Sequence, residues 1–209
     1  MQHRILPIIV NVISYLAPAD IKHYSYQETV AETNTRYESI ASDLVEVVFD
    51  KDEKPIYTGD DARVRTLSVM LAIDSFESGF HKDVDQGFGK FSKGDHGASW
   101  CLGQINLGGQ RVHVKEDGTI EYGTGWSGQD LVQDRKKCFR VQLAILRSSF
   151  ACPTSVEDGK LSLYASGDCS KGFTASQNRM KLARKLQSKF FQVTDIEALQ
   201  EPVLADEDY

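Results

Sequence analysis

A stretch without helix-breaking residues, 61–79, constrains the fold more than any other part of this 209-residue chain. It contains no proline, Asp60 or Asp61 can cap its start, and Gly79 can end it. The stretch therefore predicts a long α-helix. Residues three or four positions apart share one face of a helix, and four residues are spaced in this way: Thr66, Met70, Ile73 and Glu77.

Glu77 lies at the C-terminal end of this mostly apolar face. A carboxylate in that place is poorly solvated and close to the negative end of the helix dipole, and both effects are expected to raise its pKa. A glutamate that stays protonated near neutral pH is suited to general acid catalysis. For this helix alone, the simpler interpretation is a glutamate that emerges from the core where the helix ends.

A glycine-rich segment, 94–106, follows this helix and reads G-D-H-G-A-S-W-C-L-G-Q-I-N. The helix itself ends in E-S-G-F at residues 77–80. An E-S-G-F helix end followed by a glycine-rich loop that closes on G-Q-I-N resembles the soluble lytic transglycosylase and goose-type lysozyme superfamily. The common order there is G-A-x-G-L-M-Q-I. Here Gly97-Ala98 is followed by one residue too many, and Gly103 directly precedes Gln104.

A third motif, Tyr164-Ala165-Ser166-Gly167, resembles the Y-N-x-G motif of the same enzymes, with Ala165 in place of the usual asparagine. With it, the resemblance extends from Val64 to Leu186. It implies a mainly α (α+β), lysozyme-like fold with a small β-hairpin beside the active-site cleft. It also implies an enzyme that cleaves peptidoglycan at the β-1,4 bond between N-acetylmuramic acid and N-acetylglucosamine.

The resemblance assigns roles to individual residues. Glu77 is the expected catalytic acid, and Tyr164 is expected beside it. The residues expected to bind the glycan are Ser99, Gln104, Ile105, Asn106 and Tyr164. Aromatic rings also stack on sugar faces, and about half of four candidates are expected to contact the ligand. These four are Trp100, Tyr122, Trp126 and Tyr164.

A second carboxylate decides between two reactions, because glycosidases generally use an acid together with a base or nucleophile. Lytic transglycosylases use one glutamate, which leads to a 1,6-anhydro product. Goose-type lysozymes carry one aspartate nine residues before the glutamine and another two after it. Here Asp95 has the first position and Asn106 the second. We therefore predict a single-glutamate lytic transglycosylase, with a hydrolytic muramidase that holds water on Asp95 as the alternative. A second alternative is a non-catalytic wall-binding or virion structural protein, and a weaker third is a disulfide-held inhibitor or effector.

Asp74 lies one helical turn before Glu77. Like-charge repulsion from Asp74 would raise the pKa of Glu77. The interpretation that we favour is a salt bridge between Asp74 and a nearby arginine such as Arg140.

Other segments give conventional structural signals. Residues 34–49 predict a packing helix with Thr33 or Asn34 as its cap, and residues 110–122 predict a hairpin with Asp117-Gly118 in its turn. A capping box at 127–130 opens a long helix that stops at Cys152-Pro153. Residues 160–164 predict a short helix, and 174–191 a final helix whose exposed side is basic: Arg179, Lys181, Arg184, Lys185 and Lys189.

The composition fits one domain over residues 20–193, with 41% hydrophobic residues. The net charge is −6, and all of it can be assigned to the tail, 194–209, which has six acidic residues and no Lys or Arg. We expect this tail to be mobile. The nearly neutral remainder suits a neutral or mixed-charge polymer, and the acidic balance argues against nucleic-acid binding. We expect a monomer.

The N-terminus has two interpretations. A basic start, the apolar run 5–16 and the Ala17-Pro18-Ala19 site match a secretory signal peptide over residues 1–19, which predicts a secreted or periplasmic protein. The run is too short to span a membrane. The alternative is an N-terminal segment that packs on the core, in which case delivery with a phage virion is another route.

The four cysteines have no C-x-x-C spacing, which argues against a zinc or redox motif. Their even number permits one or two disulfides, and four buried thiols are the alternative. Cys152 and Cys169 bracket the Tyr164 segment, so they are the favoured pair. The five histidines are scattered, and we predict neither a metal nor a cofactor.

Overall fold

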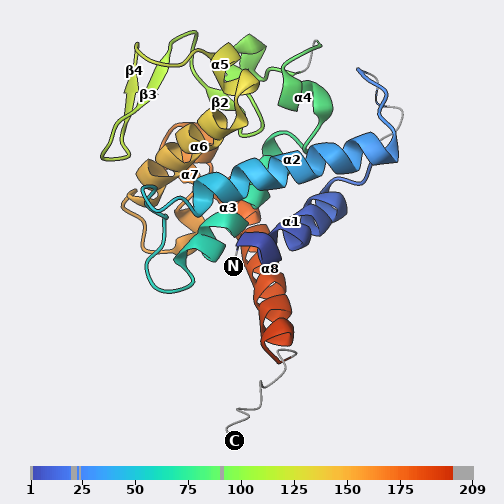
Figure 1. Cartoon of the computed structure of the whole chain (residues 1–209). Helices are drawn as coiled ribbons and strands as arrows, with labels where there is room; N and C mark the ends of the chain where they lie inside the picture. The colour runs from blue at the N-terminus through green and yellow to red at the C-terminus, as the bar shows by residue number, and fades with distance from the viewer. Residues whose placement is uncertain (1, 20–22, 24, 90–91, 200–209) are drawn as a thin grey trace, which may run out of the picture.

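Helix α3 (Ala62–Glu77) runs through the middle of the computed structural model, which describes residues 2–19, 23, 25–89 and 92–199 (Figure 1). Every residue from Thr66 to Asp74 is buried, so α3 is covered on all sides. Asp61 occupies the N-cap position and Ser78 the C-cap position. The helix predicted over residues 61–79 is therefore confirmed.

The described part of the chain is mainly helical, as predicted. The other helices are α1 (Gln2–Leu16), α2 (Val30–Val48), α4 (Lys82–Gln86), α5 (Gly128–Gln133), α6 (Arg135–Phe150), α7 (Ser162–Ser166) and α8 (Phe173–Leu199). Single 3-10 turns cover Asp95–Gly97 and Glu157–Gly159.

Two small antiparallel sheets complete the fold. One pairs β1 (Ser99–Trp100) with β2 (Ile105–Asn106), and the other pairs β3 (Val112–Val114) with β4 (Ile120–Tyr122). The second sheet is the predicted hairpin, and it projects from the helical body in Figure 1. The first was not predicted, because two-residue strands have no recognisable alternation.

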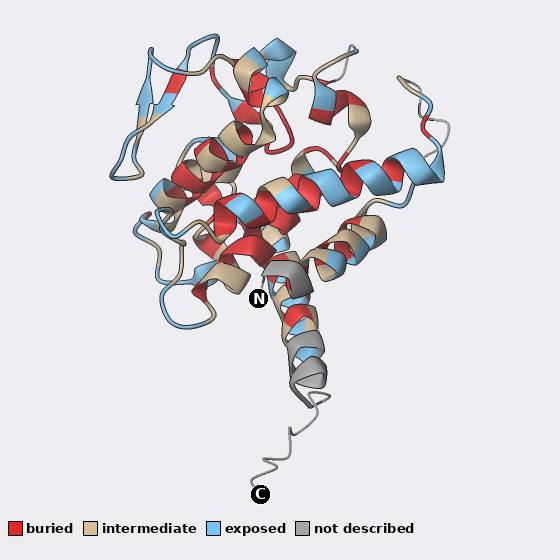
Figure 2. Cartoon of the chain, in the orientation of Figure 1, coloured by how far each residue is buried: buried red, intermediate tan, exposed pale blue. Residues whose placement is uncertain are grey.

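The main core forms around α3. Helices α1, α2 and α8 pack against α3, and α6, which packs on α2, adds side chains to the same core (Figure 2). Its largest fully buried side chains include Phe80, Phe139 and Phe190. A second, smaller core lies under the two sheets: Cys101, Ile105, Leu107, Val112, Leu131, Cys138 and Val141. The two cores thus divide the molecule into a helical body and a region built on loops and strands.

All four cysteines form disulfides. Cys152 pairs with Cys169, as favoured from the sequence, and Cys101 pairs with Cys138. The second bridge links the glycine-rich segment to α6 across 37 residues.

Two helix starts differ from the prediction. Helix α2 begins at Val30, because Thr29 and Glu32 form a capping box that satisfies the first backbone N–H groups. The predicted capping box at Ser127 and Asp130 is present, but it opens only the short α5. Asp134 then adopts extended backbone angles and caps α6 through its side chain, which divides the predicted long helix into two.

The final helix is longer than predicted. Helix α8 continues to Leu199, eight residues beyond the predicted end at Phe191. The first strong helix breaker after Gly172 is Pro202, so nothing in the sequence ends the helix earlier. The tail predicted as mobile over 194–209 is thus helical up to Leu199, and residues 200–209 lie outside the described part.

The N-terminal segment forms α1, which packs on the core as in the alternative interpretation. Four of its apolar side chains are buried: Ile5, Ile9, Val12 and Ile13. Among the described helices, none has both the length and the apolar character needed to cross a membrane.

Candidate active site

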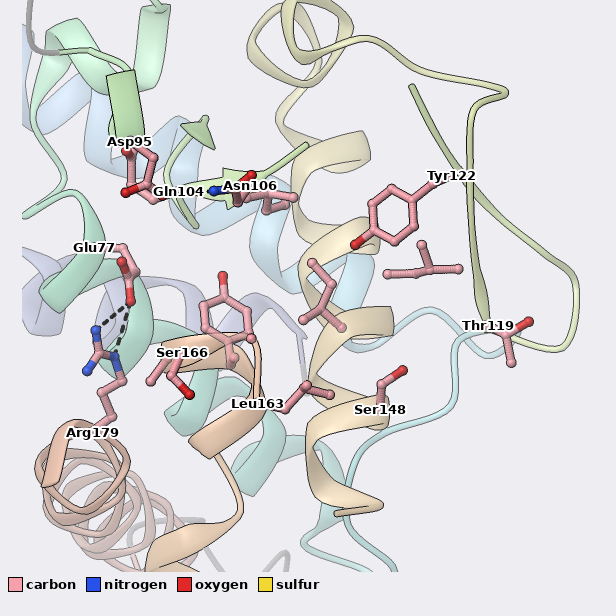
Figure 3. A pocket seen from close by; sticks show the side chains of 16 residues that line it. Glu77, Asp95, Gln104, Asn106, Thr119, Tyr122, Ser148, Leu163, Ser166 and Arg179 are labelled. Carbon is pink, nitrogen blue, oxygen red and sulfur yellow. Dashed lines mark hydrogen bonds and ion pairs between the residues drawn. The ribbon is translucent and has the colours of Figure 1, made fainter. Parts of the chain in front are cut away.

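A cleft of about 850 Å³ lies where the helical body meets the β-hairpin. Its walls come from the end of α3, the glycine-rich segment, β2, β4, α6, α7 and α8. Figure 3 shows Glu77, Asp95 and Arg179 at one end of this cleft, with Tyr122 and Thr119 at the other. The site therefore joins residues that are up to 102 positions apart in the chain.

Glu77 lies at the C-terminal end of α3 and lines the cleft. Its Oε1 accepts hydrogen bonds from Nη2 of Arg179 at 2.6 Å and from Nε at 3.2 Å (Figure 3). The two side chains are 21% and 13% exposed, and the arginine also stacks over the ring of Phe76. This ion pair gives Glu77 a charged neighbour at the end of the mostly apolar face of α3. Oε2 has no hydrogen-bond partner among the described residues.

Asp95 also lines the cleft, and two side chains hold one of its oxygens. Oδ2 accepts a hydrogen bond from the Ser99 hydroxyl at 2.6 Å and another from the Asn106 amide at 3.0 Å. The bond from Ser99, followed by that from Asn106, lowers the pKa of Asp95, so it is ionised near neutral pH. Oδ1 makes no hydrogen bond within the described structure, which leaves it available for a water molecule or a ligand.

Gln104 fixes the shape of the glycine-rich segment from within. Its Oε1 accepts a hydrogen bond from the Gly94 backbone N–H at 2.8 Å, and its Nε2 donates to the Cys101 carbonyl at 3.1 Å. Gln104 and Asp95 both have positive φ angles, of 45° and 49°, which are rare for residues with a Cβ. Strained backbone of this kind is concentrated at functional sites.

Tyr164 lines the cleft between Glu77 and the hairpin end. Its hydroxyl donates to the Gly103 carbonyl at 2.6 Å, next to Gln104. Burial, followed by the charge of the nearby Glu77, raises the pKa of Tyr164 well above its usual value. The phenol is therefore neutral and acts as a hydrogen-bond donor.

Asp74 does not pair with Arg140, so the favoured interpretation was wrong. Its buried carboxylate accepts a hydrogen bond from Gln142 of α6 at 2.8 Å. Arg140 instead binds Asp50 and Glu53 on the far side of α6. Helix α6 presents Arg140 and Gln142 in different directions, because residues two positions apart do not share a helix face.

Of the other residues predicted to belong to the site, some line the cleft and some do not. Ile105 and Asn106 line the cleft, as does Tyr122. Ser99 is buried and reaches Asp95 instead of the cleft. Trp126, predicted as a glycan-binding residue, does not line this cleft but a separate cavity of about 390 Å³ beside Arg140 and Arg147.

Trp100 is the second aromatic residue outside the cleft. Its indole packs so closely on Gly128 that a Cβ there would lie 2.1 Å from the ring. Tyr122 and Tyr164 therefore remain as the two aromatic candidates for sugar contact, half of the four.

The sequence did not indicate two features of the cleft. Arg179 belongs to the face of the last helix that was interpreted as solvated, and its position 102 residues after Glu77 gives no local signal. The apolar side chains at the hairpin end, Ile120, Ile145 and Leu163, come from three elements. Only the tertiary fold brings them together.

Within residues 2–19, 23, 25–89 and 92–199, no three His, Cys, Asp or Glu side chains come together in an arrangement that could hold a metal ion.

Comparisons with known proteins do not identify the chain. A scan of protein families, a search of curated proteins and a search of solved structures each found no match.

Proposed function

We propose that this protein is a peptidoglycan-cleaving enzyme with a lysozyme-like fold, acting on the β-1,4 bond between N-acetylmuramic acid and N-acetylglucosamine. One observation carries the proposal: Glu77, Gln104, Ile105, Asn106 and Tyr164, from three separate motifs, line one cleft. A binding protein would need shape and hydrogen bonds, whereas a carboxylate in the wall of the cleft also provides for acid catalysis.

In this proposal Glu77 is the general acid, and its two oxygens have different roles. Oε1 stays bonded to Arg179, and Oε2 is the oxygen that passes a proton to the substrate. Glu77 gives this proton to the glycosidic oxygen as the bond from C1 to that oxygen breaks. The carboxylate that results then accepts the proton of the muramyl 6-hydroxyl while O6 bonds to C1, which yields the 1,6-anhydro product and restores the acid. Arg179 stabilises the negative charge between the two steps.

The opposite end of the cleft suits the rest of the glycan. Ile120, Ile145 and Leu163 offer apolar surface, and the half-exposed ring of Tyr122 can stack on a sugar face. Ser148, Ser166 and Thr119 add hydroxyl groups that can bond to sugar hydroxyls and acetamido groups.

Hydrolysis is the second candidate reaction, and the unpartnered Oδ1 of Asp95 favours it. An inverting glycosidase holds its water between two carboxyl groups roughly 6.5–9.5 Å apart. Asn106 supports the single-glutamate reaction instead, because an amide at this position binds Asp95 and cannot act as a base.

The test of catalysis is lysis of purified cell wall in a zymogram, with Glu77→Gln as the variant. Loss of the general acid should reduce lysis by about a hundredfold or more. Glu157→Gln is the matched control, since Glu157 also pairs with arginines but lies outside the cleft. Normal lysis by the Glu77→Gln protein would contradict the assignment. Binding to cell wall without release of fragments by any variant would favour the non-catalytic alternative.

The product separates the two reactions. Mass spectrometry of released fragments should show anhydro ends, which are lighter than reducing ends by one water molecule. If the wild type yields only reducing ends and Asp95→Asn abolishes their formation, the reaction is hydrolysis.

We further propose that the protein works outside the cytoplasm, because two disulfides suit an oxidising compartment. N-terminal sequencing of the secreted form tests the route. A start at Asp20 indicates signal cleavage, and a start at Met1 indicates that α1 stays in the fold and that delivery follows another route.

A further inference from the structure

A buried polar pair lies behind the cleft, one turn before Glu77. Asp74 of α3 and Gln142 of α6 are both fully buried, and the Gln142 amide donates to Oδ1 of Asp74 at 2.8 Å. The mechanism above uses neither residue. Two polar side chains in an apolar helix–helix interface are costly unless their hydrogen bonds are complete.

Each partner has one buried atom left without a hydrogen bond. These atoms are Oδ2 of Asp74 and Oε1 of Gln142. Both are acceptors when the aspartate is ionised, so neither can satisfy the other. A single proton on Oδ2 turns it into a donor, and an acid and an amide can then form two opposed hydrogen bonds.

The charges around Asp74 also favour the neutral acid. No Lys, Arg or His in the described structure forms an ion pair with it, and Arg179, which lines the cleft, is bound to Glu77. The carboxylate of Glu77 on the same helix adds repulsion, and from α7 the neutral phenol of Tyr164 faces the pair. Burial, opposed in part by the bond from Gln142 and reinforced by Glu77, raises the pKa of Asp74 to about 8.

The pair also borders the glycine-rich segment. A Cβ on Gly103 would lie 3.2 Å from the Gln142 amide carbon and 2.9 Å from the Tyr164 hydroxyl. Tyr164 in turn donates to the Gly103 carbonyl. The pair therefore connects the helix that carries Glu77 to the residue that precedes Gln104.

We propose that Asp74 is held as a neutral acid in a cyclic pair with Gln142, and that this pair is a positioning element that sets Glu77 against the Gly103–Gln104 backbone. The positioning role rests on the proposed function, whereas the neutral pair does not. Neither residue touches the substrate.

Asp74→Asn tests the neutral pair, because asparagine offers the same donor and acceptor without a titratable proton. Folded Asp74 has a raised pKa, so its contribution to stability is full below about pH 4, is lost as the pH rises to about 8, and changes no further above that. The unfolding constant of the wild type relative to Asp74→Asn should therefore rise roughly tenfold per pH unit within this window. Chemical denaturation from pH 4 to 9 measures it.

Asp85→Asn is the matched control. Asp85 is a buried aspartate bonded to the Arg135 guanidinium, and removal of its charge leaves this partly buried cation with Asp43 as its remaining ion-pair partner in the described structure. This variant should be less stable than the wild type at pH 7, and Asp74→Asn at least as stable. An Asp74→Asn protein that is as weakened at pH 7 as Asp85→Asn, with no pH-dependent difference from the wild type, would show that Asp74 is ionised and overturn the proposal.

The kinetics of cell-wall cleavage test the positioning role. Asp74→Asn should keep kcat within about twofold, since one hydrogen-bonded pair replaces another, whereas Asp74→Leu, which removes the pair, should lose about tenfold in kcat at unchanged KM. Equal kcat values in all three proteins would overturn the positioning role. If the wild type cleaves nothing and the pH-dependent difference in stability is still found, the neutral pair stands and the proposed function falls.

Discussion

The two walls at the Glu77 end of the cleft are stabilised in different ways. The helical wall, formed by the end of α3 and by Arg179 of α8, rests on the main core and presents Glu77 from regular backbone. The loop wall, residues 94–106, has little regular structure and presents Asp95 from a backbone with positive φ angles. Apolar burial stabilises the first wall, and side-chain hydrogen bonds together with a disulfide stabilise the second.

This contrast shows that the cleft combines a rigidly held side chain, Glu77, with a loop whose backbone can contact a ligand. A helix in a core is a rigid support for a catalytic group. A loop offers backbone groups to a ligand, but its conformation has to be specified bond by bond, as Gln104 and Ser99 do here. We therefore expect each wall to be able to lose its structure without the other.

Loss of the Cys101–Cys138 bridge should have the largest effect. The bridge spans 37 residues, and replacement of both cysteines with serine should cost about 4 kcal/mol through chain entropy. The loop wall should lose protection in hydrogen exchange before α3 does. Replacement of Cys152 and Cys169, which span 17 residues, should cost about 3 kcal/mol and leave the loop wall protected. Equal loss of protection in both walls of the first variant would contradict the distinction.

Met70→Ala should weaken both walls together. Met70 is fully buried in the middle of α3, and its truncation should lower the free energy of unfolding by roughly 3 kcal/mol. Denaturation followed by near-UV and far-UV circular dichroism should give coincident curves. Exposed Val156, outside this core, provides the control, since Val156→Ala should change stability by less than about 0.5 kcal/mol.

Gln104 variants separate backbone strain from hydrogen bonding in the loop wall. Gln104→Ala removes the hydrogen bond to Gly94 but keeps a Cβ at a positive φ angle, which is strained. Its free energy of unfolding should therefore be lower than that of the wild type by about 2 kcal/mol. Gln104→Gly removes the same bond but relieves the strain, and it should be about 1 kcal/mol more stable than the alanine variant. The opposite order in thermal denaturation would show that the left-handed backbone at Gln104 is not strained.

The aromatic candidates should give the smallest effect, and only on binding. Tyr122→Ala should raise KM for soluble glycan fragments about threefold to tenfold, because stacking on a ring contributes about 0.5–1.5 kcal/mol. Trp126→Ala should leave KM within about twofold, since Trp126 lines the separate cavity. A larger effect from Trp126 would mean that the substrate extends across the hairpin.

The sequence predicted the helices and the hairpin better than the loop wall, because their signals are local. The apolar spacing in α3, the Ser127 capping box and the Asp117-Gly118 turn are local signals, and each was found where expected. Within the loop wall, the motif indicated which residues line the cleft but not how they are held. The bonds from Ser99 and Asn106 to Asp95 depend on a two-residue strand pairing that leaves no pattern in the sequence.

Contacts between distant elements were beyond sequence reasoning. Arg179 and Gln142 both lie on helices that were predicted, yet their partners Glu77 and Asp74 depend on how those helices pack on α3. Charge alone suggested Arg140 for Asp74, and the crossing of α6 over α3 presents Gln142 instead. A periodic pattern shows which residues share a face of a helix. Only the tertiary packing shows which element that face contacts.

The dependence of Glu77 on α8 also affects the order in which the protein can be made. Arg179 leaves the ribosome 102 residues after Glu77, which takes about 5–20 s at 5–20 residues per second. Through that interval α3 is without the apolar face of α8 that covers it, including Met180, Leu186 and Phe190. The nascent chain therefore exposes residues of α3 that are buried in the finished fold, and the cleft gains its Glu77–Arg179 ion pair only once α8 has been made.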